Sequence, residues 1–301
     1  MFEPYAVRIA QAKERQRQAF FGESAIPPLN IFCNQSIGFG AAPGTLPPRY
    51  FDDPAVMLAY QERELLARMA RIEDDFAPYL YPQFGTGVVA SAFGSTVHYL
   101  ENTDPAVGEP PITSLEQIDQ LEVPDVTRAG LMPKVLATID YMKAHSELPV
   151  GLTDIQGVLD TCAQLCGHTR LFEWMYDEPD LVHRLFDVVA QTLAAWILEQ
   201  KRHIADPDGI TYCQILALPE GFGAVLAEDD AVFMSPRLYR KFCVPANIKV
   251  FAALGGGMLH FCGDATHHID SFRETEGLRG FHTIPLGNLD ILAKLQGCLG
   301  E

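Results

Sequence analysis

The sequence has few basic residues and no long uninterrupted hydrophobic run. Its 22 Lys and Arg residues stand against 39 Asp and Glu, which gives a formal net charge of −17 at pH 7. A protein this acidic repels phosphate backbones and offers no basic stripe to a nucleic acid. No stretch approaches the roughly 20 consecutive apolar residues that span a bilayer, and segment 1–26 is typical of a polar helix without a signal-peptide core. We therefore expect a cytoplasmic protein that binds neither nucleic acid nor membrane.

Cysteine is present, but not in a pattern typical of a disulfide framework. The seven cysteines lie at long, irregular spacings in a chain that we expect to be cytoplasmic, where thiols stay reduced. A free cysteine behaves as a small hydrophobic residue unless a neighbour activates it or shares a metal with it. The spacing of Cys162 and Cys166 in CAQLCGH would put two thiols on one helix face, but it is far more typical of core packing.

Short apolar runs alternate with longer amphipathic runs along the 301 residues. The helical pattern of 53–75 begins with an Asp-Pro pair, and the stretch 161–203 predicts two helices divided at DEPD, 177–180. The runs that we predict as strands are 27–33, 76–82, 148–154, 209–218, 256–263 and 278–287. Strands that alternate with helices indicate an α/β fold with a parallel sheet, and a (β/α)8 TIM barrel is the closed version of that sheet.

We predict a single domain over residues 1–301, because no internal repeat and no Gly/Ser linker divides the chain. Within this domain, residues 1–26 form an N-terminal helix. The Pro-rich segment 91–124 is longer than a simple connection, so we interpret it as a long loop insertion over one mouth of the fold.

The predicted strand 256–263 carries a histidine and a cysteine two residues apart near its end. Side chains two apart on a strand share a face, so His260 and Cys262 point the same way. Neutral imidazole and thiolate are usual zinc ligands, and a catalytic zinc typically has three protein ligands and one open position. A packed cysteine beside a hydrogen-bonded histidine is nevertheless the commoner explanation of an isolated His-x-Cys, so the pair alone is weak evidence for a metal.

Other polar residues follow the ends of further apolar runs, where parallel α/β folds place their chemistry. They are Asp154, Glu228, Asp229, Asp230 and His282. We take Asp154, Asp230 and His282 as candidate catalytic residues and expect them to converge with the His-x-Cys pair on one rim. The acidic residues would orient a ligand imidazole or contact a substrate. Helix capping and a solvated acidic loop explain at least two of the four carboxylates equally well.

Several collinear blocks of the sequence resemble the uroporphyrinogen decarboxylase superfamily. They are SAFGSTV and PPITSLEQIDQLEVPD, then LPVGLTDIQGVLDTCAQLCG, MYDEPDLVHRLFDVV, AEDDAVFMSPRLYRKFCVPANIKVFAALGGGMLHFCGD and GFHTIPLGNLD. Together they cover most of the chain from about Ser91 onward. The resemblance is closest to the corrinoid-dependent methyltransferase branch, which includes the methylcobamide:coenzyme M methyltransferases. It implies a (β/α)8 barrel in which His260 and Cys262 are two ligands of a zinc ion.

The function that this resemblance implies is zinc-dependent methyl transfer between a corrinoid and a thiol or similar acceptor. A zinc ion that binds a thiol lowers the pKa of its sulfur, and the resulting thiolate is the nucleophile. The thiolate would attack the methyl group carried by methylcobamide while the protein orients both reactants. The implied cofactors are Zn2+ and a corrinoid, and the implied partners are a corrinoid protein or free corrinoid and a small-molecule thiol.

Two alternatives to this function stay open. A decarboxylase that acts on a tetrapyrrole resembles its relatives in an N-terminal Arg-rich segment that grips substrate carboxylates. The corresponding region here, IPPLNIFCNQSIGFGAAPGTLPPRYF, contains Arg49 as its one arginine, so a polycarboxylate would lack charge-assisted partners. In the second alternative the protein is a non-catalytic docking module for a corrinoid protein.

The resemblance also implies a third zinc ligand, a cysteine well downstream of the His-x-Cys pair. This chain has no suitable one, because Cys298 in LAKLQGCLGE is typical of a helix end. Six predicted strands in place of eight indicate that the last one or two βα units of the barrel are missing. We therefore expect weak or no zinc binding and little thiol methylation, unless a local residue such as Glu228 or Cys298 completes the site.

Overall fold

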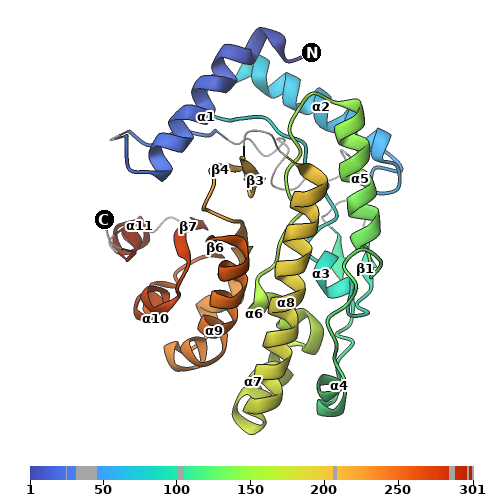
Figure 1. The fold of residues 1–301 in the computed structure, drawn as a ribbon, viewed down its shortest axis with the longest axis vertical. Coiled ribbons are helices and arrows are strands. Elements are labelled where there is room, and N and C mark those ends of the chain that lie inside the picture. Colours follow the sequence, from blue (N-terminus) through green and yellow to red (C-terminus); the bar gives the residue numbers. More distant parts are fainter. Residues whose placement is uncertain are drawn as a thin grey trace.

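A computed structural model describes residues 1–24, 26–31, 46–99, 105–205, 209–284, 289–296 and 298–299 (Figure 1). Its α-helices are α1 (Ala6–Phe20), α2 (Pro54–Arg71), α3 (Val88–Ser91), α4 (Leu115–Asp119), α5 (Met132–His145), α6 (Val158–Cys166), α7 (His168–Asp177), α8 (Pro179–Ile204), α9 (Pro236–Leu254), α10 (Ile269–Glu274) and α11 (Asp290–Gln296). Short 3-10 helices are η1 (Glu3–Tyr5), η2 (Asp229–Phe233) and η3 (Thr266–His268). The strands are β1 (Val97–His98), β2 (Ala106–Val107), β3 (Thr211–Cys213), β4 (Leu216–Leu218), β5 (Val225–Ala227), β6 (Gly257–Cys262) and β7 (Leu278–Ile284).

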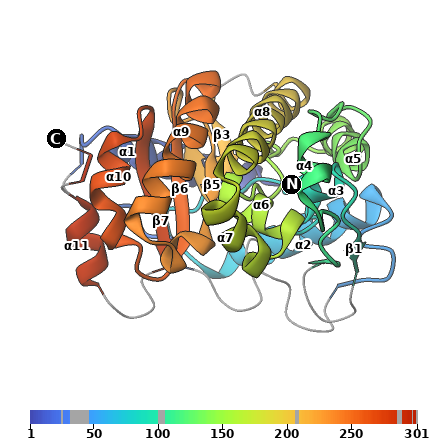
Figure 2. The same cartoon turned by 90° about the horizontal axis from the view of Figure 1, so that it is seen from below.

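A parallel sheet of β5, β6 and β7 lies at the centre of the C-terminal half. Its register aligns Ala227 with His260 and His260 with His282. Figure 2 shows the three strands side by side, with α10 and α11 on the side of β7 and α6 and α7 on the side of β5. The predicted strand 256–263 is confirmed by β6. The prediction for 278–287 is confirmed as far as Ile284, and 285–287 lie outside the described residues.

The predicted strands 76–82 and 148–154 are not regular strands, and the chain there forms isolated β-bridges. Leu80 bridges Val150 in parallel, and Gln156 bridges Ala227 in the same sense. The N–H of Leu152 donates to the carbonyl of Tyr212. Segment 148–156 therefore lies alongside Leu80, Tyr212 and Ala227, as an irregular strand would. Within the described ranges this makes a parallel sheet with irregular extensions and not a closed ring of eight strands, so the barrel stays a prediction.

The predicted strand 209–218 is wrong, because the chain reverses in its middle. β3 and β4 pair antiparallel, with Cys213 opposite Leu216. The two residues between them, Gln214 and Ile215, have φ of 47° and 66°. Positive φ at both central positions is the geometry of the two-residue turn that matches strand twist. The hairpin is not evident from the sequence, because Gln214 is the only residue at the turn that interrupts the apolar run. The short strand β5 that follows was not among the predicted strands.

Helix boundaries follow local capping chemistry. As predicted, α2 begins after Asp53, whose carboxylate accepts a hydrogen bond from the N–H of Ala55, with Pro54 in the first turn. The two helices predicted over 161–203 are three. The break at Glu178 is confirmed, and a second break occurs at Gly167, where a φ of 79° ends α6 and begins α7.

The N-terminal helix and the long insertion are partly as predicted. The helix of segment 1–26 is α1, preceded by η1. The insertion 91–124 contains the antiparallel pair β1 and β2 as well as α4, so its described part carries its own secondary structure, and residues 100–104 lie outside the description. Residues 27–31 of the first predicted strand are not in a strand, and 32–33 lie outside the described residues.

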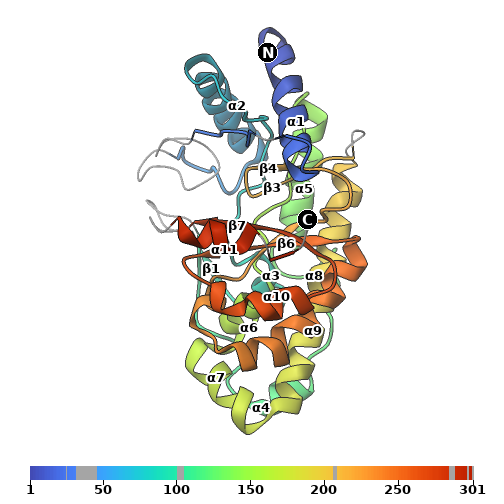
Figure 3. The same ribbon diagram turned by 90° about the vertical axis from the view of Figure 1, so that its left-hand side faces the viewer.

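The long helix α8 organises the core. Among the described helices it alone is long and apolar enough to cross a membrane by length and composition. Its side chains Leu193, Trp196 and Ile197 are fully buried, and it packs against α4, α5, α6, α7 and α9. These contacts are those of a core helix, and a helix of this kind passes the same length and composition test. Figures 1 and 3 show α1 and α2 at one end of the molecule and α4 and α7 at the other.

Candidate metal centre

His260 and Cys262 project together from the end of β6, as the sequence predicts. The Sγ of Cys262 lies 3.4 Å from the Nε2 of His260. His260 is buried, with 5% of its surface exposed, whereas Cys262 is half-buried. Because both residues are on one strand, their spacing is fixed by the backbone and does not depend on a loop.

Asp229 is the third residue of this cluster. It begins η2, directly after β5, and its Oδ1 accepts a hydrogen bond of 2.6 Å from the N–H of Cys262. The same oxygen lies 3.7 Å from the Nε2 of His260. The possible ligand atoms of the three residues all lie within 4.8 Å of one another. We name Asp229, His260 and Cys262 the three-donor cluster.

The tautomer of His260 follows from its second ring nitrogen. Nδ1 lies 3.0 Å from the backbone carbonyl oxygen of His282, and only a protonated nitrogen can donate to a carbonyl. Nε2 therefore carries the lone pair and faces the other two donors. Burial lowers the pKa of His260, so the ring is neutral. A neutral imidazole held by a backbone carbonyl is the usual arrangement of a metal-ligating histidine.

His282 lies beside His260 on the neighbouring strand, with ring centroids 4.7 Å apart. Burial, with the neighbouring ring of His260, lowers the pKa of His282 to about 4. Its Nδ1 is buried without a hydrogen-bond partner among the described residues. His282 is thus a neutral imidazole with a free polar atom next to the three-donor cluster.

The Cys262 thiol is protonated when no cation is near it. Burial and the neighbouring carboxylate of Asp229 raise its pKa to about 11. A bound cation reverses this effect, because coordination lowers the pKa of a sulfur ligand until the proton leaves. The electrostatics of the cluster therefore favour a cation in contact with Cys262.

Asp160 holds the backbone of η2 in place. Its two carboxylate oxygens accept hydrogen bonds from the N–H groups of Asp229, at 2.8 Å, and Asp230, at 3.1 Å. Burial raises the pKa of Asp160. Sequence reasoning missed this residue, because Asp160 lies in α6, about 70 positions before the residues that it holds.

Glu228 faces away from the cluster. Its Oε2 accepts hydrogen bonds from the hydroxyl of Tyr239 at 2.6 Å and from the amide of Asn247 at 3.2 Å, in an interior that solvent does not reach. Burial raises its pKa to about 7. Only its backbone serves the cluster, since the N–H of Glu228 donates to the carbonyl of His260 at 2.8 Å. Glu228 is therefore not the residue that completes the ligand set.

The remaining candidate catalytic residues, Asp154 and Asp230, form hydrogen bonds with residues outside the cluster. Asp154 accepts from the amides of Gln156 and Gln214, both at 3.3 Å. Asp230 pairs with His168, with 2.9 Å between Nε2 and Oδ2. The structure brings His282 next to His260, whereas the convergence of Asp154 and Asp230 on the same rim stays a prediction.

The other cysteines that the structure describes lie outside the three-donor cluster. Cys162 and Cys166 are buried in α6, as a core position predicts. Cys298 is buried near α10, where its Sγ lies 3.6 Å from the carbonyl oxygen of Ile269. Cys298 thus has a packing environment of its own and is not among the residues whose ligand atoms cluster with His260 and Cys262.

The three-donor cluster fits a zinc ion. Zinc bonds of about 2.3 Å to sulfur and about 2.0 Å to nitrogen, at tetrahedral angles, place the two ligand atoms about 3.5 Å apart. The observed separation between Cys262 Sγ and His260 Nε2 is 3.4 Å. Thiolate, imidazole and carboxylate are all common zinc ligands, and three of them leave one coordination position open.

Comparisons with known proteins agree with this fold. A family model described as uroporphyrinogen decarboxylase matches residues 82–289. A protein named uroporphyrinogen decarboxylase from Chlorobium chlorochromatii is 28% identical over 165 residues, and one of the same name from Chlorobaculum tepidum is 27% identical over 165 residues. Each alignment covers 52% of this chain and 42% of the relative, so the match spans less than half the length of these proteins.

A solved structure shares the fold over a longer stretch. A methyltransferase from Methanosarcina mazei superposes with a TM-score of 0.66 at 17% sequence identity. The superposition covers 90% of this chain and 75% of that chain. At this identity the likeness shows a common fold.

Proposed function

The chain belongs to the uroporphyrinogen decarboxylase family, and within it we propose a zinc-dependent methyltransferase that moves a methyl group between a corrinoid and a thiol. The observation that carries this proposal is the three-donor cluster, since His260, Cys262 and Asp229 bring together three donor atoms that would bind a cation and leave one coordination position open. The closed (β/α)8 barrel belongs to the same proposal, as does the cytoplasmic setting in which a corrinoid and small thiols would be met.

Asp229, His260 and Cys262 would hold the metal, each from a defined element of the sheet. Zinc bound there supplies a positive charge that stabilises a substrate thiolate at neutral pH. From the sequence alone we predicted two zinc ligands, His260 and Cys262, and therefore weak zinc binding or none. A carboxylate oxygen as third donor supports binding by this chain, although a thiolate in its place would bind a borderline-soft ion more tightly.

The chain's own residues have separate tasks in this proposal. His282, a neutral imidazole beside His260, would contact the substrate next to the metal. Asp160 orients Asp229 by holding the backbone of η2. Asp154 and Asp230 would contact substrate at the rim, and a corrinoid, free or on a carrier protein, would deliver or accept the methyl group there.

A decarboxylase is the second candidate, because both curated relatives carry that name. A tetrapyrrole with several carboxylates needs cationic partners. Arg49 is the one arginine of segment 26–51, and it pairs with Asp53, with 3.0 Å between Nη2 and Oδ2. The lack of an arginine cluster in this segment favours the methyltransferase.

The test combines metal content with turnover. Purified protein is analysed for zinc and then assayed for methyl transfer from methylcobalamin to a panel of small thiols and, in parallel, for decarboxylation of uroporphyrinogen. We expect bound zinc and thiol methylation, with both lost in Cys262→Ser and both kept in Cys298→Ser, whose hydroxyl can still bond to the carbonyl of Ile269.

Each other outcome selects an alternative. Decarboxylation without thiol methylation would favour the second candidate. Binding of a corrinoid protein without zinc and without turnover would leave a docking module. Equal zinc content in Cys262→Ser and the parent protein would remove Cys262 from the site.

A further inference from the structure

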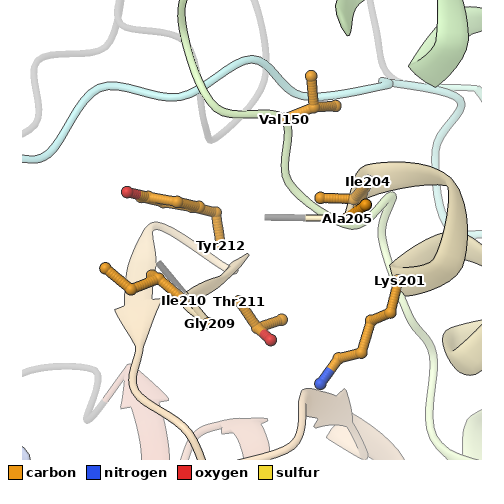
Figure 4. A pocket seen from close by; sticks show the side chains of 8 residues that line it. All are labelled: Val150, Lys201, Ile204, Ala205, Gly209, Ile210, Thr211 and Tyr212. Carbon is orange, nitrogen blue, oxygen red and sulfur yellow. The ribbon is translucent and has the colours of Figure 1, made fainter. Parts of the chain in front are cut away.

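A cavity of about 230 Å³ lies between the last turn of α8 and the start of β3 (Figure 4). Val150 belongs to its wall, and Val150 precedes Gln156 by six residues on a segment that runs parallel to β5. Gln156 is level with Ala227 and His260. The cavity is therefore at the amino ends of the strands, opposite the end that carries the three-donor cluster.

Among the described residues that line the cavity, Lys201 is the one with a charged side chain. Its Nζ donates a hydrogen bond of 2.7 Å to the carbonyl oxygen of Gly223. Among the described residues no carboxylate forms an ion pair with Lys201, in a chain whose formal net charge is −17. Burial lowers the pKa of Lys201, which is the expected response of an ammonium group without a counter-charge.

The rest of the wall is apolar except for one hydroxyl. Ile204, Ile210 and the ring of Tyr212 provide hydrocarbon surface, and Thr211 provides the hydroxyl. In Figure 4 the Lys201 side chain extends from α8 toward the side of the cavity where Thr211 lies. An ammonium and a hydroxyl beside hydrocarbon walls are complementary to a carboxylate on a small apolar body.

We propose that this cavity binds a small monocarboxylate, with the carboxylate on Lys201 and Thr211 and the apolar body against Ile204, Ile210 and Tyr212. A ligand carboxylate would supply the counter-charge that the described residues do not provide to Lys201, and a charge-assisted hydrogen bond is the strongest single contact that this wall can make. The site is separate from the three-donor cluster and does not depend on the function proposed for it.

A purely structural role of Lys201 is the competing explanation. In that case the ammonium only ties α8 to the turn before β5 through the carbonyl of Gly223, and the cavity stays filled with water. The two explanations differ in one property. A structural lysine gives no preference for an anion over a neutral molecule of the same shape.

The experiment uses isovalerate and its neutral counterpart isovaleramide as probes of the intact protein. Binding is followed by ligand-observed NMR and calorimetry. We expect isovalerate to bind with a Kd of about 1 mM or tighter, and isovaleramide at least about tenfold more weakly. Lys201→Met keeps the aliphatic stem and should weaken isovalerate binding at least about tenfold, whereas Thr211→Val should weaken it by a smaller factor.

The control is Lys249→Met, which removes an exposed lysine of α9 that pairs with Asp187 and is not part of the cavity wall. It should bind isovalerate as the parent protein does. Equal binding of isovalerate and isovaleramide, equal binding by Lys201→Met, or no saturable binding at about 10 mM isovalerate would each overturn the proposal.

Discussion

The two ends of the central strands differ in the sign of the charge that they are built to accept. At the carboxyl ends, Asp229, His260 and Cys262 offer lone pairs with no cation among the described side chains to meet them. At the amino ends, Lys201 offers an ammonium that donates to the carbonyl of Gly223 and pairs with no carboxylate in the described part of the chain. The same parallel strands therefore support opposite electrostatics at their two ends. An unpaired charge inside a protein is costly, so it points to a ligand site. The net charge of the chain carries no such local information.

The largest expected effect is at the carboxyl end. His260→Ala removes the imidazole of the three-donor cluster and leaves only two protein ligands, Cys262 and Asp229. We expect zinc affinity to fall by at least about 100-fold, as for loss of a direct ligand. Competition with a fluorescent chelator measures this change. Unaltered affinity would mean that the metal, if bound, is elsewhere.

The second prediction concerns Glu228, the buried carboxyl beside the cluster. Its folded pKa is about 7, above the value of about 4.3 in an unfolded chain. Its stabilising contribution is therefore fully present below about pH 4.3 and is lost as pH rises toward 7 and beyond. Glu228→Gln removes this ionisation. We expect the free energy of unfolding of metal-free Glu228→Gln, relative to that of the parent protein, to be about 4 kcal/mol higher well above pH 7 than at pH 4.

Urea unfolding at a series of pH values, with chelator present, measures the difference. Asp187→Asn serves as the control, because this exposed carboxylate of α8 pairs only with Lys249 and Gln191. Parallel stability curves for the parent protein and Glu228→Gln would contradict the burial argument.

The third prediction weakens the cluster without removing a ligand. Asp160→Ala frees the N–H groups of Asp229 and Asp230, so η2 loses the contacts that aim the Asp229 carboxylate. We expect zinc affinity to fall about tenfold, as for a residue that orients a ligand. The conservative Asp160→Asn, which keeps one acceptor oxygen, should restore part of the loss. If both variants bind zinc like the parent protein, Asp160 has no orienting role.

The smallest expected effect tests the independence of the two ends. Lys201→Met should leave zinc affinity within about twofold of the parent value, because distant sites without shared partners behave additively. Chelator competition again provides the measurement. A larger change would show that the two ends are coupled and that the comparison between them must be revised.

The parts of this molecule that the sequence predicted are those set by near neighbours in the chain. The alternation of a strand places His260 and Cys262 on one face, and an aspartate before a proline begins α2. The parts that it missed depend on contacts between distant segments. Asp229 joins the cluster only because β5 lies in register beside β6, which begins 30 residues after β5 ends. The hairpin turn at Gln214 and Ile215 was also missed, because both residues have positive φ but neither is the glycine that usually marks such a turn.

The family match and the shared fold were within reach of the sequence, because many collinear blocks carry them. The third donor was not, because the expectation that the site lacks a third ligand rested on counting cysteines. The structure brings the carboxylate of Asp229 close to His260 and Cys262. Whether zinc binds to these three residues is the question that decides the proposal.

X-ray absorption at the zinc edge of the zinc-loaded protein tests the central claim most directly. The account predicts one sulfur neighbour per zinc at about 2.3 Å, with nitrogen and oxygen neighbours at about 2.0–2.2 Å, and loss of the sulfur signal in Cys262→Ser. A first shell without sulfur, or with two sulfurs, would contradict the ligand set of Asp229, His260 and Cys262.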